Sequence, residues 1–155
     1  MLRVHGSKVR YVHDLVGINS RLDALQAAIL RVGLRHLEGW VARRRSLAER
    51  YRSGLQGLAE LSLPRDQAYA APAHHLFVVR HPRRDGLAAS LQERGVGTLV
   101  HYPVPLHLQP AFEGLGRAGA FPVAEKAAGE ILSLPLYPEM SDAQADAVII
   151  CVPTP

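Results

Sequence analysis

The stretch Gly17-Ile-Asn-Ser-Arg-Leu-Asp-Ala-Leu-Gln-Ala-Ala-Ile-Leu30 joins a short polar turn to the start of a long amphipathic pattern. Asn19 and Ser20 are residues that favour a helix N-cap, and Ser20 with Asp23 has the spacing of a capping box in which Asp replaces Glu or Gln. A helix N-terminus also leaves backbone N–H groups free for a phosphate. The stretch therefore predicts a helix start, which is either a plain cap or an anion site.

The pattern that follows predicts one very long helix. From about Asp23 to Leu58 the apolar residues recur three or four positions apart, which is the helical period. Gly33 and Gly39 weaken this helix, each by about 1 kcal/mol relative to Ala at an exposed site, and allow a bend near them. A helix of this length suits a connection between two lobes.

Shorter elements follow the helix. The pattern predicts strands at 75–80, 96–101 and 133–136, and helices at 84–94, 123–132 and 141–151, with a proline-rich loop at 102–110. Val78-Val79 supports the first strand, and Gly95 occupies the position of a C-cap glycine. This order of strands and helices predicts an α+β fold, preceded by an arm at residues 1–18 that lacks clear periodicity.

Composition indicates a globular domain. The chain has 155 residues, 48% of them hydrophobic, which is enough for one domain with a substantial core. Its single cysteine, Cys151, fits a reducing compartment. The N-terminus lacks an apolar segment of signal-peptide length, and apolar runs such as 147–152 are too short to span a bilayer. We therefore expect a soluble cytoplasmic protein that does not enter a membrane.

Charge and histidine content suggest two further sites, and both are weak. The net charge is +4, and Arg43-Arg44-Arg45 with Arg50 and Arg52 could grip phosphates. These arginines alternate with acidic and apolar residues, so a solvated helix face is favoured over a nucleic-acid patch. The eight histidines lack cysteine or carboxylate partners at ligand spacing, so no metal site is expected.

Three segments carry a resemblance to a known family. They are Gly17-x-Asn19-x-Arg21-Leu22-Asp23-x-Leu25-Gln26-Ala27-Ala28-Ile29-Leu30, His101-Tyr102-Pro103-x-Pro105-x-His107-x-Gln109-Pro110 and Leu132-Ser133-Leu134-Pro135-x-Tyr137-Pro138. In this order they resemble the DegT/StrS family of pyridoxal-phosphate-dependent nucleotide-sugar aminotransferases, which serve the synthesis of polysaccharide or antibiotic sugars. The resemblance runs from about Gly6 to the C-terminus.

The resemblance implies the C-terminal portion of such an enzyme. The expected fold is the small C-terminal lobe of a fold-type I transferase: a long N-terminal helix and a small, mainly antiparallel sheet covered by helices. Residues 1–18 would be an arm or the stub of a missing large domain, and residues 19–155 the small domain. A homodimer is expected.

The resemblance also implies that this chain is catalytically incomplete. Transamination requires a lysine that forms a Schiff base with the cofactor and then moves a proton on the substrate. In the family this lysine lies well upstream of the Gly-x-Asn-x-Arg motif, and neither Lys8 nor Lys126 matches it. We therefore expect neither transamination nor cofactor binding by this chain alone, although the intact family uses pyridoxal phosphate.

Five residues are the candidate site residues. The resemblance places Asn19 at the cofactor phosphate of the neighbouring subunit, and a guanidinium such as Arg21 suits a phosphate, a diphosphate or a carboxylate. Arg21 could equally pair with Asp14 or Asp23. The resemblance places His101 and Tyr102 near the cofactor and the sugar nucleotide, with His107 a weaker candidate.

Two functions remain open. The chain is either the C-terminal domain of an aminotransferase that moves an amino group, typically from glutamate, to a keto-sugar nucleotide, or a non-catalytic remnant. Such a remnant would bind a sugar nucleotide or a full-length paralogue.

Overall fold

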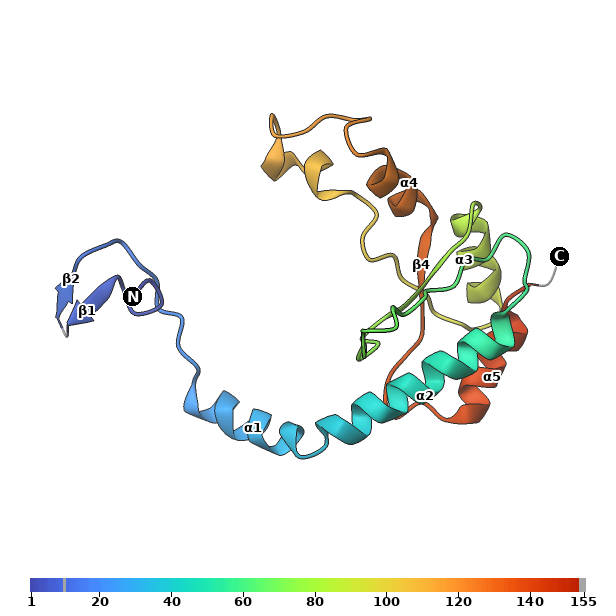
Figure 1. The fold of residues 1–155 in the computed structure, drawn as a ribbon, viewed down its shortest axis with the longest axis horizontal. Coiled ribbons are helices and arrows are strands. Elements are labelled where there is room, and N and C mark those ends of the chain that lie inside the picture. The colour runs from blue at the N-terminus through green and yellow to red at the C-terminus, as the bar shows by residue number, and fades with distance from the viewer. Residues whose placement is uncertain (10, 154–155) are drawn as a thin grey trace. The chain divides into compact units, whose positions relative to one another are not determined.

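The computed structural model describes residues 1–9 and 11–153, which divide into two compact units between Gly39 and Trp40. The strands and helices of both are labelled in Figure 1. The secondary structure is that of an α+β protein. No helix of the described residues is long and apolar enough to cross a membrane.

The first unit begins with a small folded loop. Strands β1 (Ser7–Val9) and β2 (Val12–His13) pair antiparallel, and Val4 forms a β-bridge with Asn19. Two glycines allow the close approach of this loop to itself, because a Cβ on Gly17 would lie 2.2 Å from the backbone nitrogen of Gly6. The loop therefore fixes the backbone on both sides of the turn that leads to the first helix.

Helix α1 (Ala24–Leu34) does not use the predicted cap. Its N-cap is Asp23, whose side chain accepts from the amides of Leu25 and Gln26 at 2.8 and 3.3 Å. The prediction of Asn19 or Ser20 was wrong because their backbones belong to the loop: Asn19 bridges to Val4, and the Ser20 amide donates to the Arg3 carbonyl at 2.9 Å.

The predicted continuous helix is two helices. α1 ends at Leu34 and α2 spans Leu37–Leu55. The amides of Arg35 and His36 donate to the carbonyls of Val32 and Gly33 at 3.1 and 3.0 Å, which closes a turn between them. The interruption lies beside Gly33, where the low helix propensity of glycine predicted a bend.

The second unit contains the remaining elements. They are β3 (Phe77–Arg80), α3 (Arg84–Glu93), the 3₁₀ turns η1 (Leu106–Leu108) and η2 (Pro110–Phe112), α4 (Pro122–Glu130), β4 (Ile131–Leu134) and α5 (Asp142–Cys151). The predicted helices of this unit are confirmed to within two residues. Gly95 follows α3 at φ +78°, as a C-cap glycine should.

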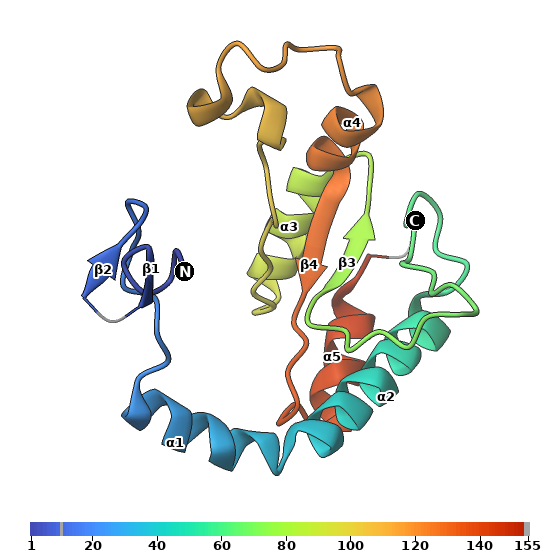
Figure 2. The same ribbon diagram turned by 60° about the vertical axis from the view of Figure 1, so that its left-hand side comes forward.

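The sheet of the second unit has two strands, β3 and β4, paired antiparallel (Figure 2). The predicted strand at 96–101 is reduced to one β-bridge, between Leu99 and Ser133, and the strand predicted at 133–136 begins earlier, at Ile131. Val96 is buried, but Leu99 is 67% exposed, so this segment does not have the burial of an inner strand.

The core lies on one face of this sheet. Phe77 and Val79 of β3 are fully buried, and their cross-strand partners are Leu134 and Leu132. Tyr51 of α2 packs on Phe77 with ring centroids 5.1 Å apart. Its hydroxyl donates to the Pro135 carbonyl at 2.7 Å, which satisfies a phenol that has no exposed surface.

The arginines of α2, which were predicted to form a solvated face, are exposed or half-buried and also bind the protein itself. Arg44 donates to the carbonyls of His74, His75 and Leu136 at 3.3, 3.0 and 2.8 Å. Arg45 donates to the carbonyls of residues 71 and 72, at 2.7 and 2.9 Å. These bonds hold the loop before β3 and the segment after β4 against the helix.

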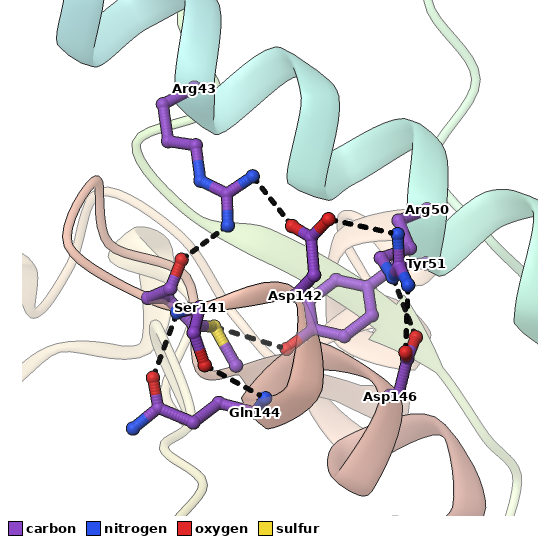
Figure 3. A network of polar contacts seen from close by, with 8 residues as sticks. Arg43, Arg50, Tyr51, Ser141, Asp142, Gln144 and Asp146 are labelled. Atoms are coloured by element: carbon purple, nitrogen blue, oxygen red, sulfur yellow. Dashed lines mark hydrogen bonds and ion pairs between the residues drawn. The ribbon is translucent and has the colours of Figure 1, made fainter.

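Helix α5 is joined to α2 by ion pairs (Figure 3). Arg43 contacts Asp142 at 2.7 Å, and Arg50 contacts Asp146 at 2.6 Å, which lowers the pKa of the Asp146 carboxyl through that hydrogen bond. Ser141 caps α5 in a capping box with Gln144. Because all these groups are partly exposed, the ion pairs contribute little to stability. Their main effect is to orient α5 against α2.

Candidate functional site

The first candidate site, in the first unit, is a hollow of about 420 Å³ at the turn before α1. Residues of one short segment line it: Asn19, Arg21, Leu22, Asp23 and Ala24. Arg21 Nε donates to Asn19 Oδ1 at 2.9 Å. Among the described residues Arg21 forms this bond rather than an ion pair with Asp14 or Asp23, so the alternative of a surface salt bridge is not observed.

This geometry suits an anion, though not in the way predicted. The carboxylate of Asp23 occupies the N-terminus of α1 and takes up two of its amides. A phosphate in the hollow would therefore be held by side chains, namely the amide NH₂ of Asn19 and the remaining N–H groups of Arg21. The bond from Arg21 to Asn19 Oδ1 turns the Asn19 amide so that its oxygen is used and its nitrogen is free for an acceptor.

The second candidate site, in the second unit, is the segment that leaves the sheet after Leu99. His101 is half-buried, and its Nδ1 lies 2.9 Å from the hydroxyl of Ser133. Tyr102 is 73% exposed and its ring stands edge-on to that of His101, with centroids 5.7 Å apart. The structure thus brings His101 and Tyr102 together and leaves the Tyr102 ring open to a ligand.

His107 is engaged within its own loop. Its Nε2 lies 2.9 Å from Glu125 Oε1, and its ring packs on Phe121 with centroids 4.8 Å apart. The amides of Gly119 and Phe121 also donate to the Glu125 carboxylate, at 2.9 and 3.2 Å. Together with His107, these amide bonds lower the pKa of Glu125. His107 therefore braces the loop that follows Tyr102.

Two residues of this region were missed by the sequence analysis. Ser133 interrupts the apolar run of β4 with a hydroxyl, which is a readable signal for a buried polar contact. Glu125 carried no such signal, because an acidic residue in the first turn of a helix is common for electrostatic reasons.

The two lysines are on the surface. Lys8 is exposed in β1, and Lys126 is 72% exposed on α4, where its Nζ lies 3.8 Å from Glu130. Across residues 1–9 and 11–153, no three His, Cys, Asp or Glu side chains gather where they could hold a metal ion.

Comparison with known proteins shows which family the chain belongs to. The model of the DegT/DnrJ/EryC1/StrS aminotransferase family matches residues 1–153. The chain is 52% identical over 150 residues to the erythromycin biosynthesis sensory transduction protein EryC1 of Saccharopolyspora erythraea, covering 96% of this chain and 41% of that protein. It is 48% identical to the dTDP-3-amino-3,4,6-trideoxy-alpha-D-glucose transaminase of Streptomyces venezuelae, covering 98% and 40%.

Solved structures agree. The S. venezuelae DesV structure, in complex with a ketimine intermediate, matches with a TM-score of 0.93 and 48% identity, over 98% of this chain and 41% of that one. A DegT DnrJ EryC1 StrS aminotransferase from Brucella abortus matches with a TM-score of 0.87 and 35% identity, over 97% and 40%. This chain spans about 40% of the length of these relatives, and it belongs to the DegT/DnrJ/EryC1/StrS aminotransferase family, as a C-terminal portion.

Proposed function

We propose that this chain is the C-terminal segment of an aminotransferase that moves an amino group, typically from glutamate, to a keto sugar linked to dTDP. The observation that carries the proposal is the 48% identity, over 98% of the chain, to a dTDP-amino-sugar transaminase. The lysine that the reaction needs would come from the part of the enzyme outside these residues, so the segment by itself is inactive and binds no cofactor.

Pyridoxal phosphate, when bound, supplies the electron sink for amino-group transfer. The hollow at Asn19 and Arg21 fits its phosphate, because one amide and one guanidinium lie 2.9 Å apart there. Asn19 donates to a phosphate oxygen, and Arg21 orients the Asn19 amide and adds positive charge. In the proposed assembly this phosphate belongs to the neighbouring subunit.

His101 and Tyr102 bind the substrate side of the site. The exposed ring of Tyr102 offers a face to a base or a sugar, and the imidazole of His101 offers a polar atom beside it. His107, held by Glu125, keeps the following loop in place and contributes to substrate binding through that loop.

The exposed face of α1 supports a homodimer. None of the residues of α1 is buried, and Leu25, Ile29 and Leu30 are 71%, 64% and 56% exposed. An apolar helix of this kind is expected to be covered in the assembled protein, by the remainder of the enzyme and by a second subunit. The proposed location is the cytoplasm, with which the unpaired Cys151 is compatible.

The proposal is tested with a chimera in which this chain replaces the matching 40% of the S. venezuelae transaminase. Purified chimera, pyridoxal phosphate and glutamate should convert a dTDP-linked 3-keto sugar into the amino sugar, measured by mass spectrometry. The 155-residue chain on its own, under the same conditions, should yield no product. A folded chimera that binds the cofactor and aminates none of the dTDP-keto sugars offered would refute the proposal.

The variant Asn19→Ala tests whether Asn19 holds the cofactor phosphate. The loss of a hydrogen bond to a charged phosphate costs about 1.5–3 kcal/mol, which corresponds to roughly a 10- to 100-fold weaker cofactor affinity in the chimera. Ser20→Ala is the control, because Ser20 is exposed, neighbours Asn19 and does not line the hollow. Equal affinity in both variants would exclude Asn19 from the phosphate site.

A further inference from the structure

Ser133 is a buried polar side chain. It lies between Leu132 and Leu134 on β4 and is 4% exposed, which makes it the buried polar residue of the part of the chain that the structure describes. Burial of a hydroxyl is unfavourable unless the hydroxyl is hydrogen-bonded. Its partner is Nδ1 of His101, at 2.9 Å.

The backbone of the same residue holds the segment that carries His101. The Ser133 amide donates to the Leu99 carbonyl at 2.8 Å, and the Leu99 amide donates to the Ser133 carbonyl at 3.3 Å. His101 is two positions beyond Leu99, and its ring reaches the Ser133 hydroxyl. Ser133 therefore fixes the start of the loop at 102–110 through its backbone and the His101 ring through its side chain.

This face of the sheet is not the one that packs on α2. Ser133 lies opposite Val78, whereas Phe77 and Val79, which alternate with Val78, point into the core. A serine at this position is therefore not required to fill the core. Its hydroxyl forms a hydrogen bond with Nδ1 of the His101 imidazole, and this bond fixes the orientation of the ring.

We propose that Ser133 is a positioning residue that fixes the imidazole of His101 through Nδ1 and leaves Nε2 for the sugar-nucleotide substrate. The proposal rests on the proposed function for the role of His101, but the contact between Ser133 and His101 does not. Loss of the hydroxyl frees the ring to rotate and to exchange tautomers, so the substrate would have to order it on binding.

The direct test is nitrogen NMR of the 155-residue chain labelled with ¹⁵N-histidine, with the His101 signals assigned from a His101→Gln variant. Ser133→Ala should move the His101 Nδ1 and Nε2 shifts towards those of a free imidazole in tautomeric exchange. Ser133→Thr, which keeps the hydroxyl, should restore them. Unchanged His101 shifts in Ser133→Ala would overturn the proposal.

Ser62→Ala is the matched control. Ser62 flanks the other edge of the sheet and exchanges backbone hydrogen bonds with Arg80, both at 2.9 Å, as Ser133 does with Leu99, but it is exposed. This substitution should leave the His101 shifts unchanged. A shift of the same size in Ser62→Ala would overturn the proposal, since the effect would then report on the sheet and not on the hydroxyl.

Kinetics of the chimera test the consequence for the substrate. Ser133→Ala should raise KM for the keto sugar about tenfold, the equivalent of one hydrogen bond, with a smaller change in kcat, and Ser133→Thr should rescue it. An unchanged KM alongside altered NMR shifts would overturn the substrate role of Ser133. An inactive parent chimera would count against the proposed function, while the NMR experiment would still decide the contact.

Discussion

Tyr51→Phe removes one oxygen atom from the centre of the second unit. The phenol has no exposed surface, and its hydroxyl donates to the Pro135 carbonyl at 2.7 Å. Burial raises the pKa of Tyr51 above its ordinary value, so the hydroxyl stays protonated as a donor. Because the ring remains in contact with Phe77, the substitution isolates the hydrogen bond from the packing.

The expected fall in the free energy of unfolding follows from the hydrogen bond between the Tyr51 hydroxyl and the Pro135 carbonyl. Its net contribution is about 1 kcal/mol, and the Pro135 carbonyl, at a half-buried residue, recovers part of its hydration when the hydroxyl is lost. We expect the free energy of unfolding to fall by about 1–2 kcal/mol, with an unchanged urea m-value. The thermal midpoint should fall by roughly 2–8 °C at the 2–4 °C per kcal/mol of domains near this size.

The assay is urea unfolding followed by far-UV circular dichroism. Tyr69→Phe is the control, because Tyr69 is 90% exposed and its variant should lie within about 0.5 kcal/mol of the parent. A Tyr51→Phe variant that also lies within 0.5 kcal/mol would refute the reasoning, since the hydrogen bond would then contribute nothing beyond what water supplies.

Three further perturbations follow from the contacts. Arg44→Ala removes donors from three backbone carbonyls and should lower the free energy of unfolding by about 1–3 kcal/mol in urea, whereas Arg35→Ala, at an exposed site, should stay within 0.5 kcal/mol. The folded pKa of Glu125 is lowered, so its carboxylate stabilises the loop fully above the ordinary value of 4.5, and this contribution disappears as pH falls through the lower folded value. Hydrogen-exchange protection of the Gly119 amide should follow this titration and become independent of pH in Glu125→Gln; protection that is unchanged in acid would contradict it. Asp23→Ala removes the N-cap of α1 and should destabilise that helix by about 1 kcal/mol, seen as weaker helical NMR signals in its first turn, and an unchanged first turn would argue against the cap.

Local chemistry was enough to predict most of the second unit. The helix start at Ser141, the glycine after α3 and the β-branched pair in β3 were each predictable from the residues at that position. The prediction of a strand at 96–101 was wrong because the apolar side chains of this segment do not determine whether its backbone pairs with a neighbouring strand. Within this segment only Leu99 forms a β-bridge, and its partner is Ser133. The continuous helix was wrong because propensity does not say whether a turn will close at Arg35 and His36.

In the second unit, the site residues were predictable only as separate residues. Motif resemblance indicated His101 and His107, but their partners depend on contacts distant in sequence. Ser133 reaches His101 across 32 positions, and Glu125 reaches His107 across 18. The arginines of α2 show the same limit, because the carbonyls that they bind belong to loops whose path the sequence does not encode locally.

We propose that this segment completes an aminotransferase whose lysine lies outside it. The most direct measurement is borohydride reduction of the chimera with pyridoxal phosphate, followed by mass mapping of the modified lysine. We expect stoichiometric modification of one lysine in the S. venezuelae portion, with Lys8 and Lys126 unmodified. Stoichiometric modification at Lys8 or Lys126, or no modification of a folded chimera, would contradict it.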